Sequence, residues 1–192
     1  MTAKLPFRAV LRNGEIVLIR EIGPDDRRLM RDGFEKLSKQ SRFFRFLAPH
    51  SQLSEAELDQ FTESNTDEHF AIGAVSVGVE ADLPLATARF VRLSEGAKDA
   101  EFALTIIDSH QRLGLGSLLL RTMARAAHAR GIERFTALLH HENRGMQALM
   151  RCFGGHRMTP GTEEEWILPL PLKPEPTLSK QPSEIAIWRK PV

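Results

Sequence analysis

The segment at 110–131, HQRLGLGSLLLRTMARAAHARG, limits the possible folds of this 192-residue chain more than any other stretch. Gly114 and Gly116 stand just before a long run with the composition of a helix. We expect this helix to extend from about Gly116 to Arg130, with Gly131 as its C-terminal cap. Glycine often marks the point where a strand turns into a helix, because the backbone there takes a positive φ. Bare backbone at a helix start also suits a second purpose, the binding of a phosphate.

β-rich runs lie on both sides of this segment. Before it come HFAIGAVSVGV, LATARFVRL and AEFALTII, separated by turn signals such as Asp82-Leu83-Pro84, so we expect three strands in an antiparallel meander. After it, FTALL at 135–139 is apolar on both faces, which is typical of a buried strand reached by a helical crossover. These elements predict an α/β chain.

Further elements flank this central part. Ser54 and Glu57 have the spacing of a capping box at the start of a helix. We expect helices at 24–37, at 38–47, from Ser54 onward and at 143–153, and strands at 15–20 and 164–170. We therefore divide the chain into an N-terminal extension (1–14), a single domain (15–170) and a proline-rich C-terminal tail (171–192).

The composition indicates a soluble protein with no general affinity for nucleic acid or membranes. Its 26 basic and 25 acidic residues give a formal charge of +1, so any anion site must be local. No stretch approaches the length of a membrane span, and the N-terminus does not resemble a signal peptide. Cys152 is the only cysteine, which excludes a disulfide within the chain and fits a reducing compartment. We expect a cytoplasmic protein.

Two common phosphate-binding motifs do not fit the glycine segment. A Walker A loop ends in Gly-Lys-Ser/Thr, which is absent here. The dinucleotide fingerprint needs a third glycine three residues after the second, where this chain has Leu119. What remains is QRLGLG at 111–116, whose amides at the start of a helix can converge on a pyrophosphate.

This hexapeptide resembles the Q/R-x-x-G-x-G/A signature of the GCN5-related N-acetyltransferase (GNAT) superfamily. SRFFRFLAP, LSEAELDQFT, AEFALTI and HENRGMQALMRCFGG also resemble GNAT domains of the protein-lysine acetyltransferase type, so the likeness covers roughly 15–170. It implies a GNAT fold, with a mixed, mostly antiparallel sheet of about six to seven strands flanked by helices. It also implies acetyl-CoA as co-substrate, no metal, an amine acceptor that is a protein lysine or a small molecule, and a monomer or homodimer.

The resemblance assigns coenzyme contacts to the loop and to the strand before it. In the family this strand carries a β-bulge and splays from its neighbour, so that its edge can pair with the pantetheine arm. An N–H near Ile107 would stabilise the oxyanion that forms when the amine attacks, although Ile106 and Ile107 also suit core packing. Asn143 corresponds to a coenzyme contact or to an ordinary N-cap. The implied coenzyme-binding residues are Ile106, Ile107, Asp108, Arg112, Leu113, Gly114, Leu115, Gly116, Ser117 and Asn143.

Glu101 is the candidate general base. An amine acceptor with a pKa of about 10.4 is mostly protonated at neutral pH and must lose a proton directly or through a water. Many GNAT enzymes place a glutamate on this strand for that purpose; the alternative is an exposed glutamate at a strand start. The tyrosine that often serves as general acid is missing, since its place is taken by Met150 and the chain has no tyrosine. Either the thiolate departs without a protein acid, or Cys152 or a water supplies its proton.

Two other functions remain open from the sequence. A CoA-binding module that senses or regulates without catalysis fits the missing tyrosine, and an α/β domain without CoA would use its glycines only as a turn. Arg42 and Arg45, in the region that borders the acceptor groove of the resembled family, are candidates to meet an acidic acceptor. The adjacent His140 and His141 project in opposite directions from a strand and therefore do not predict a metal site.

Overall fold

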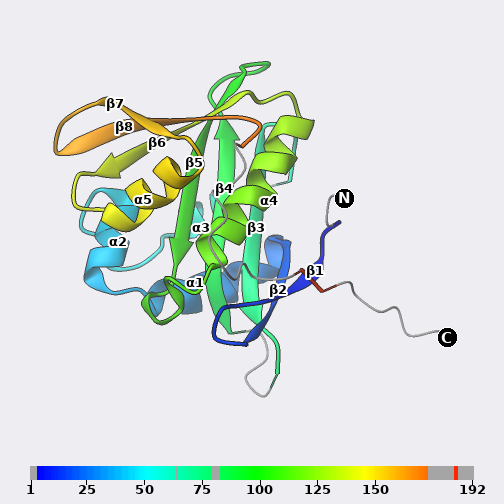
Figure 1. The fold of residues 1–192 in the computed structure, drawn as a ribbon. Helices are drawn as coiled ribbons and strands as arrows, with labels where there is room; N and C mark the ends of the chain where they lie inside the picture. Colours follow the sequence, from blue (N-terminus) through cyan, green and yellow to red (C-terminus); the bar gives the residue numbers. More distant parts are fainter. Residues whose placement is uncertain (1–3, 64, 79–82, 173–183, 186–192) are drawn as a thin grey trace.

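The protein, seen here in a computed structural model that describes residues 4–63, 65–78, 83–172 and 184–185, is built around one twisted sheet (Figure 1). Nine strands follow the order β7-β8-β6-β5-β4-β3-β2-β1-β9. Neighbouring strands are antiparallel except β5 and β6, which are parallel, so the expected mixed, mostly antiparallel α/β fold is confirmed. The strands are β1 (Phe7–Val10), β2 (Ile16–Glu21), β3 (His69–Ser76), β4 (Pro84–Arg92), β5 (Asp99–Ile106), β6 (Arg134–His140), β7 (His156–Thr159), β8 (Glu163–Pro169) and β9 (Glu184–Ile185).

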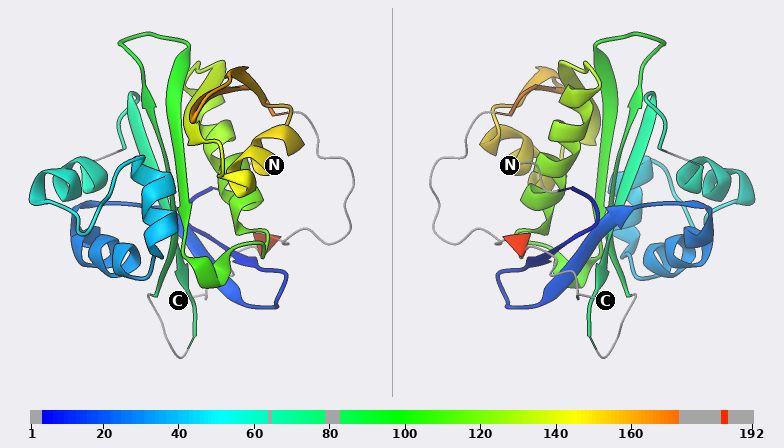
Figure 2. Two further views of the ribbon diagram at one scale, coloured as in Figure 1. Left: turned by 90° about the vertical axis from the view of Figure 1, so that its left-hand side faces the viewer. Right: turned by 90° about the vertical axis from the view of Figure 1, so that its right-hand side faces the viewer.

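The helices lie in two layers, one on each face of the sheet. Figure 2 shows α1, α2 and α3 on one face and α4 and α5 on the other. Their bounds are α1 (Arg27–Glu35), α2 (Lys39–Phe46), α3 (Glu55–Thr62), α4 (Leu115–Ala129) and α5 (Arg144–Cys152), with short 3-10 turns η1 (Pro24–Asp26) and η2 (Asp108–His110). We refer to the two sides of the sheet as the α1–α3 face and the α4 face.

Three strands lie outside the elements that the sequence predicts. β1 pairs with β2 and falls within the range 1–14 that was expected to be an extension. β7 consists of four exposed residues, so it lacks the alternation of buried and exposed side chains by which a strand is recognised. β9 pairs with β1 inside the expected tail, of which the structure describes only 171–172 and 184–185.

The helix ends follow the sequence signals. The Ser38 hydroxyl accepts from the Ser41 N–H at 3.1 Å and begins α2. Ser54 and Glu57 form the expected capping box at α3, in which the Ser54 N–H donates to the Glu57 carboxylate at 2.8 Å. Gly131 follows α4 with φ +78°, a left-handed conformation that suits glycine after a helix.

The core fixes α4 against the middle of the sheet. Leu119, Leu120 and Met123 of α4 are fully buried together with aromatic side chains of the strands. Among the latter, Phe102 of β5 and Phe135 of β6 stack with ring centroids 4.9 Å apart. The start of α4 is thereby held next to the end of β5. Within the described part of the chain, no helix is long and apolar enough to cross a membrane.

Candidate active site

β5 and β6 separate soon after they start. Their parallel pairing covers only Asp99 to Glu101 on β5, where Glu101 lies opposite Thr136. β5 then continues to Ile106 and β6 to His140 without further pairing. The splay expected for these strands is therefore present, and it leaves one edge of β5 without a strand partner beyond Glu101.

The glycine segment forms a tight loop at the start of α4. Gly114 has φ +92° and is the N-cap of the helix. A Cβ atom added to Gly116 would lie 3.4 Å from the Ile106 side chain and 3.5 Å from that of Leu149, so glycine allows α4 to begin close to β5. The first bond into the helix runs from the Leu118 N–H to the Gly114 carbonyl at 3.1 Å. The N–H groups of 115–117 precede that bond and are placed to donate to an anion.

Contacts with the N-terminal hairpin hold this loop in place. The Arg12 N–H, in the turn between β1 and β2, donates to the Leu113 carbonyl at 3.1 Å. The side chains of His110 and Glu15 are hydrogen-bonded at 3.0 Å.

The loop is also tied to the strand that precedes it. Gln111 Nε2 donates to the Ile106 carbonyl at 3.2 Å. The first residue of the QRLGLG motif thus ties the loop back to the end of β5.

The Asp108 carboxylate binds α2 instead of facing the loop. It accepts from the Ser38 N–H at 2.9 Å and from the hydroxyls of Ser38 and Ser41 at 2.8 and 2.9 Å. Burial acts to raise the pKa of Asp108, but these hydrogen bonds outweigh it and hold the pKa below its usual value. This tie, which nothing in the sequence indicated, joins the end of β5 to the α1–α3 face.

Replacing Asp108 by alanine is expected to lower the free energy of unfolding by about 1–2 kcal/mol, because three donors lose a charged acceptor. Since the folded pKa is depressed, the stabilisation is complete above about pH 4 and is lost as the pH falls through the folded pKa. Denaturant titrations at several pH values measure both effects. Asp108→Asn is the control, because it retains an acceptor oxygen without the charge. If the stability difference between wild type and Asp108→Asn did not shrink as the pH is lowered from 7 toward the acid range, this account would be contradicted.

The backbone of β5 corrects one expectation about the thioester site. The Ile107 N–H donates to the Leu85 carbonyl of β4 at 2.9 Å, so it points away from the splayed edge, and the Ile107 side chain is buried. Because hydrogen-bonding groups alternate along a strand, the Ile106 N–H points to that edge instead. The register between β4 and β5 is also regular from Ala86–Ile106 to Arg92–Ala100, so the β-bulge expected in this strand is absent there.

Glu101 faces the opposite side of the sheet from the glycine loop. It is exposed and lies opposite Val91 of β4. Arg89, whose partner on β5 is Ala103, is a diagonal neighbour on the same face. The charge of Glu101 acts on the guanidinium groups of both Arg89 and Arg45, the latter from α2. Glu101 therefore stands at the splay with two cationic side chains on the α1–α3 face.

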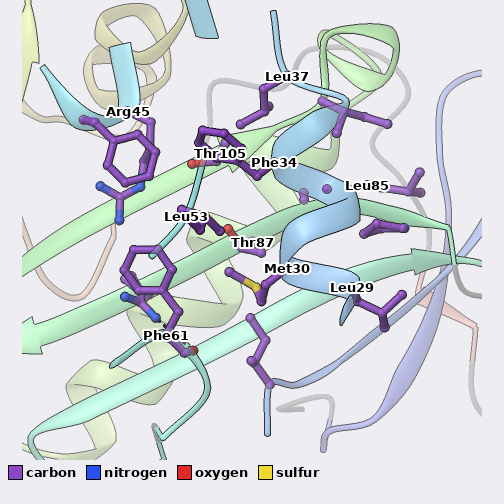
Figure 3. Close-up of a pocket in the computed structure, with 17 residues that line it drawn as sticks. Leu29, Met30, Phe34, Leu37, Arg45, Leu53, Phe61, Leu85, Thr87 and Thr105 are labelled. Atoms are coloured by element: carbon purple, nitrogen blue, oxygen red, sulfur yellow. Dashed lines mark hydrogen bonds between the residues drawn. The ribbon is translucent and has the colours of Figure 1, made fainter. Parts of the chain in front are cut away.

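A narrow cavity of about 60 Å³ adjoins these arginines between the sheet and α1–α3 (Figure 3). Arg45 and Phe61 lie at one end of it, Met30 near the middle, and Leu29 and Leu85 at the other end. Its walls are mostly apolar, with Thr87 and Thr105 among the polar exceptions from the sheet. A cavity of this size accommodates part of a small side chain and not a coenzyme.

Comparison with known proteins identifies the fold that carries this arrangement. The acetyltransferase (GNAT) family matches residues 34–154. The chain belongs to the GNAT acetyltransferase family. It is 31% identical over 145 residues to an acetyltransferase from Pseudomonas aeruginosa, which covers 75% of this chain and 77% of that protein. It is 29% identical over 149 residues to the acetyltransferase Pat of Mycolicibacterium smegmatis, covering 78% of this chain but only 44% of that longer relative.

Solved GNAT structures agree with this assignment. The GNAT domain of S. lividans PAT superposes with a TM-score of 0.79 at 28% identity, covering 86% of this chain and 97% of that one. A cAMP-binding acyltransferase from Mycobacterium smegmatis gives a TM-score of 0.59 at 25% identity, with 88% of this chain and 50% of that chain covered. The GNAT family uses acetyl-CoA as co-substrate and acts on amine acceptors. The expected family and fold are both confirmed.

The remaining GNAT candidate residues have definite structural positions. The Asn143 side chain accepts from the Met146 N–H at 3.2 Å and is the N-cap of α5, which leaves its amide nitrogen available for a ligand. Met150, in the place of the family tyrosine, is fully buried. Cys152 is partly buried and packs against the core. Among the described residues, no group of three or more His, Cys, Asp or Glu side chains has a metal-binding arrangement.

Proposed function

We propose that this GNAT protein transfers the acetyl group of acetyl-CoA to a primary amine by direct attack of the amine on the thioester. One observation supports this most strongly: β5 and β6 part at Glu101, with the glycine loop on the α4 face and Glu101 with an apolar cavity on the α1–α3 face. The unpaired edge of β5 lies between the two. Two substrates can therefore reach the same strand from opposite sides.

The loop residues fit the pyrophosphate of the coenzyme. Gly114 takes a left-handed conformation, and the early N–H groups of α4 point out of its first turn. The unpaired edge of β5 offers backbone groups to the pantetheine arm. Asn143 can add a contact through its amide nitrogen. Acetyl-CoA supplies an activated carbonyl when it is bound, while the protein supplies orientation.

Glu101 would accept the proton of the attacking amine, directly or through a water. The Ile106 N–H, at the splayed edge, would stabilise the negative charge that develops on the thioester oxygen. We assign this role to Ile106 and not to Ile107, because the Ile107 N–H is bonded to the Leu85 carbonyl. We assign no protein acid to the leaving thiolate, because Met150 is buried away from it and a thiolate with a pKa of about 8.5 is a fair leaving group.

The protein is incubated with acetyl-CoA and a panel of small amines and lysine peptides. We expect it to release free thiol in proportion to the amount of acceptor that is acetylated. Thiol release is followed by colorimetry, and mass spectrometry of the acceptor should show one acetyl group per thiol. Titration calorimetry measures acetyl-CoA binding in parallel. Binding without release with any acceptor would support the second candidate, a CoA-binding regulatory module, which the buried Met150 favours; no binding would contradict both.

A further inference from the structure

Two arginines from different layers meet at the end of the cavity nearest Glu101. The Arg89 guanidinium, from β4, lies 4.1 Å above the Phe61 ring, and that of Arg45, from α2, lies 5.9 Å from the same ring. Arg45 also lies 5.1 Å from the ring of Phe46. Aromatic rings thus position both cations at the cavity mouth, where Figure 3 shows Arg45 beside Phe61.

These guanidinium groups have few polar partners within the protein. Arg89 Nη2 donates to the Phe61 carbonyl at 3.0 Å. Arg45 makes no hydrogen bond and no ion pair with the residues that the structure describes, although a guanidinium carries five N–H donors. Glu101 acts on both arginines through space without forming an ion pair with either in the described part of the chain. Several donors therefore remain available to a ligand.

The local charge is positive. Burial, together with the nearby charge of Arg45, lowers the pKa of Arg89 to about 9 against the opposing effect of Glu101. Burial also lowers the pKa of Arg45, against Glu101 and Glu57. A guanidinium group keeps its proton in proteins, so both side chains are cations. The Glu57 carboxylate already accepts from Ser54 and lies 3.0 Å from His50 Nε2, which leaves Glu101 as the carboxylate that faces both arginines. A second carboxylate would compensate this partly dehydrated charge, which is costly to leave unpaired.

Building on the proposed function, we propose that the natural acceptor carries a carboxylate as well as the amine, and that Arg45 and Arg89 bind this carboxylate while Glu101 receives the amine. The carboxylate would sit at the cavity mouth, and an apolar part of the acceptor could enter the cavity past Thr87 and Thr105. An α-amino acid has this chemistry, and so does a lysine beside an acidic residue in a peptide.

The test compares acceptors that differ only in the carboxylate. A panel of α-amino acids is assayed beside the matching amino-acid amides, and lysine peptides with a neighbouring aspartate beside the same peptides with asparagine. The first arm detects a free small acceptor and the second a peptide acceptor. For each pair, kcat/KM is measured by thiol release in the wild type and in Arg45→Gln, and the ratio of acid to amide is compared between proteins, which cancels differences in amine pKa.

Arg45→Gln is expected to reduce the acid-to-amide ratio about tenfold in the arm that contains the true acceptor class, without changing the KM for acetyl-CoA. Arg45→Lys should retain part of the preference because it keeps the charge. Lys39→Gln is the matched control, since it removes a positive charge from an exposed position on the same helix and should leave the ratio unchanged.

An acid-to-amide ratio that is the same in the wild type and in Arg45→Gln would overturn this proposal and leave the proposed transferase function standing. Equal losses in Arg45→Gln and Lys39→Gln would also overturn it, because they would indicate a general field and not a binding site. Absence of thiol release with every acceptor would instead contradict the transferase function itself, and the carboxylate site with it. Thermal melting of each variant shows whether it is folded.

Discussion

Glu101→Gln is expected to lower kcat by about 10²- to 10⁴-fold while leaving acetyl-CoA affinity nearly unchanged. Glutamine has nearly the same shape as glutamate but cannot take a proton. The expected loss in kcat equals the range that general base catalysis typically contributes. Glu101 is exposed and lies on the α1–α3 face of β5, on the opposite side of the sheet from the glycine loop, so we expect no direct part for its charge in coenzyme binding. Steady-state kinetics with saturating acceptor and calorimetry with acetyl-CoA measure the two quantities.

The pH dependence separates a base from a structural glutamate. Without Glu101 the acceptor must already be deprotonated in solution, so the residual rate should keep rising with pH toward the amine pKa of about 10.4. Glu21→Gln is the matched control, because Glu21 is an exposed glutamate on β2, which is separated from β5 by β3 and β4. If Glu101→Gln retains the wild-type rate and pH profile, Glu101 is not the base.

Gly114→Asp is expected to raise the dissociation constant of acetyl-CoA by about tenfold to a hundredfold. The side chain brings a negative charge to the start of α4, where the helix dipole and free amides would otherwise attract the pyrophosphate. Each factor of ten corresponds to about 1.4 kcal/mol, and a repelled phosphate together with obstructed amides accounts for one to two such factors. Titration calorimetry gives the constant directly.

Gly131→Asp provides a demanding control for this change. Gly131 also has a positive φ, +78°, but lies at the other end of α4, and a Cβ atom there meets nothing within 4 Å. Aspartate at a helix C-terminus is unfavourable for the dipole, so this variant loses at least some stability without touching the loop. Weaker binding of the same size in both variants would mean that the effect comes from damage to α4 and not from the loop.

Much of the fold can be predicted from the sequence because its signals are local. The capping box of Ser54 and Glu57, the cap at Gly131 and the apolar strand at 135–139 each depend on residues close together in the chain. The glycine loop is also local, so its place between β5 and α4 follows once those two elements are recognised. β7 could not be predicted, because its four residues are all exposed and show no alternation of buried and exposed side chains.

The parts of the site that depend on pairing could not be predicted. Which of Ile106 and Ile107 turns its N–H toward the splayed edge is decided by the register with β4, where Ile107 bonds to Leu85. Nothing local to Arg89 indicates a site, since its position beside Arg45 depends on how α2 packs across the sheet. Hydrogen bonds from Ser38 to Asp108 likewise join segments 70 residues apart.

The hairpin of β1 and β2 makes the functional unit larger than the part of the chain by which the family is recognised. The match to the family begins at residue 34, but the loop of QRLGLG is held by the Arg12 N–H and by the Glu15 side chain. A polypeptide trimmed to the matched stretch would contain the whole motif and lack two of the contacts that shape it. The residues of the QRLGLG motif and the hairpin residues that hold them in place therefore lie about a hundred positions apart in the sequence.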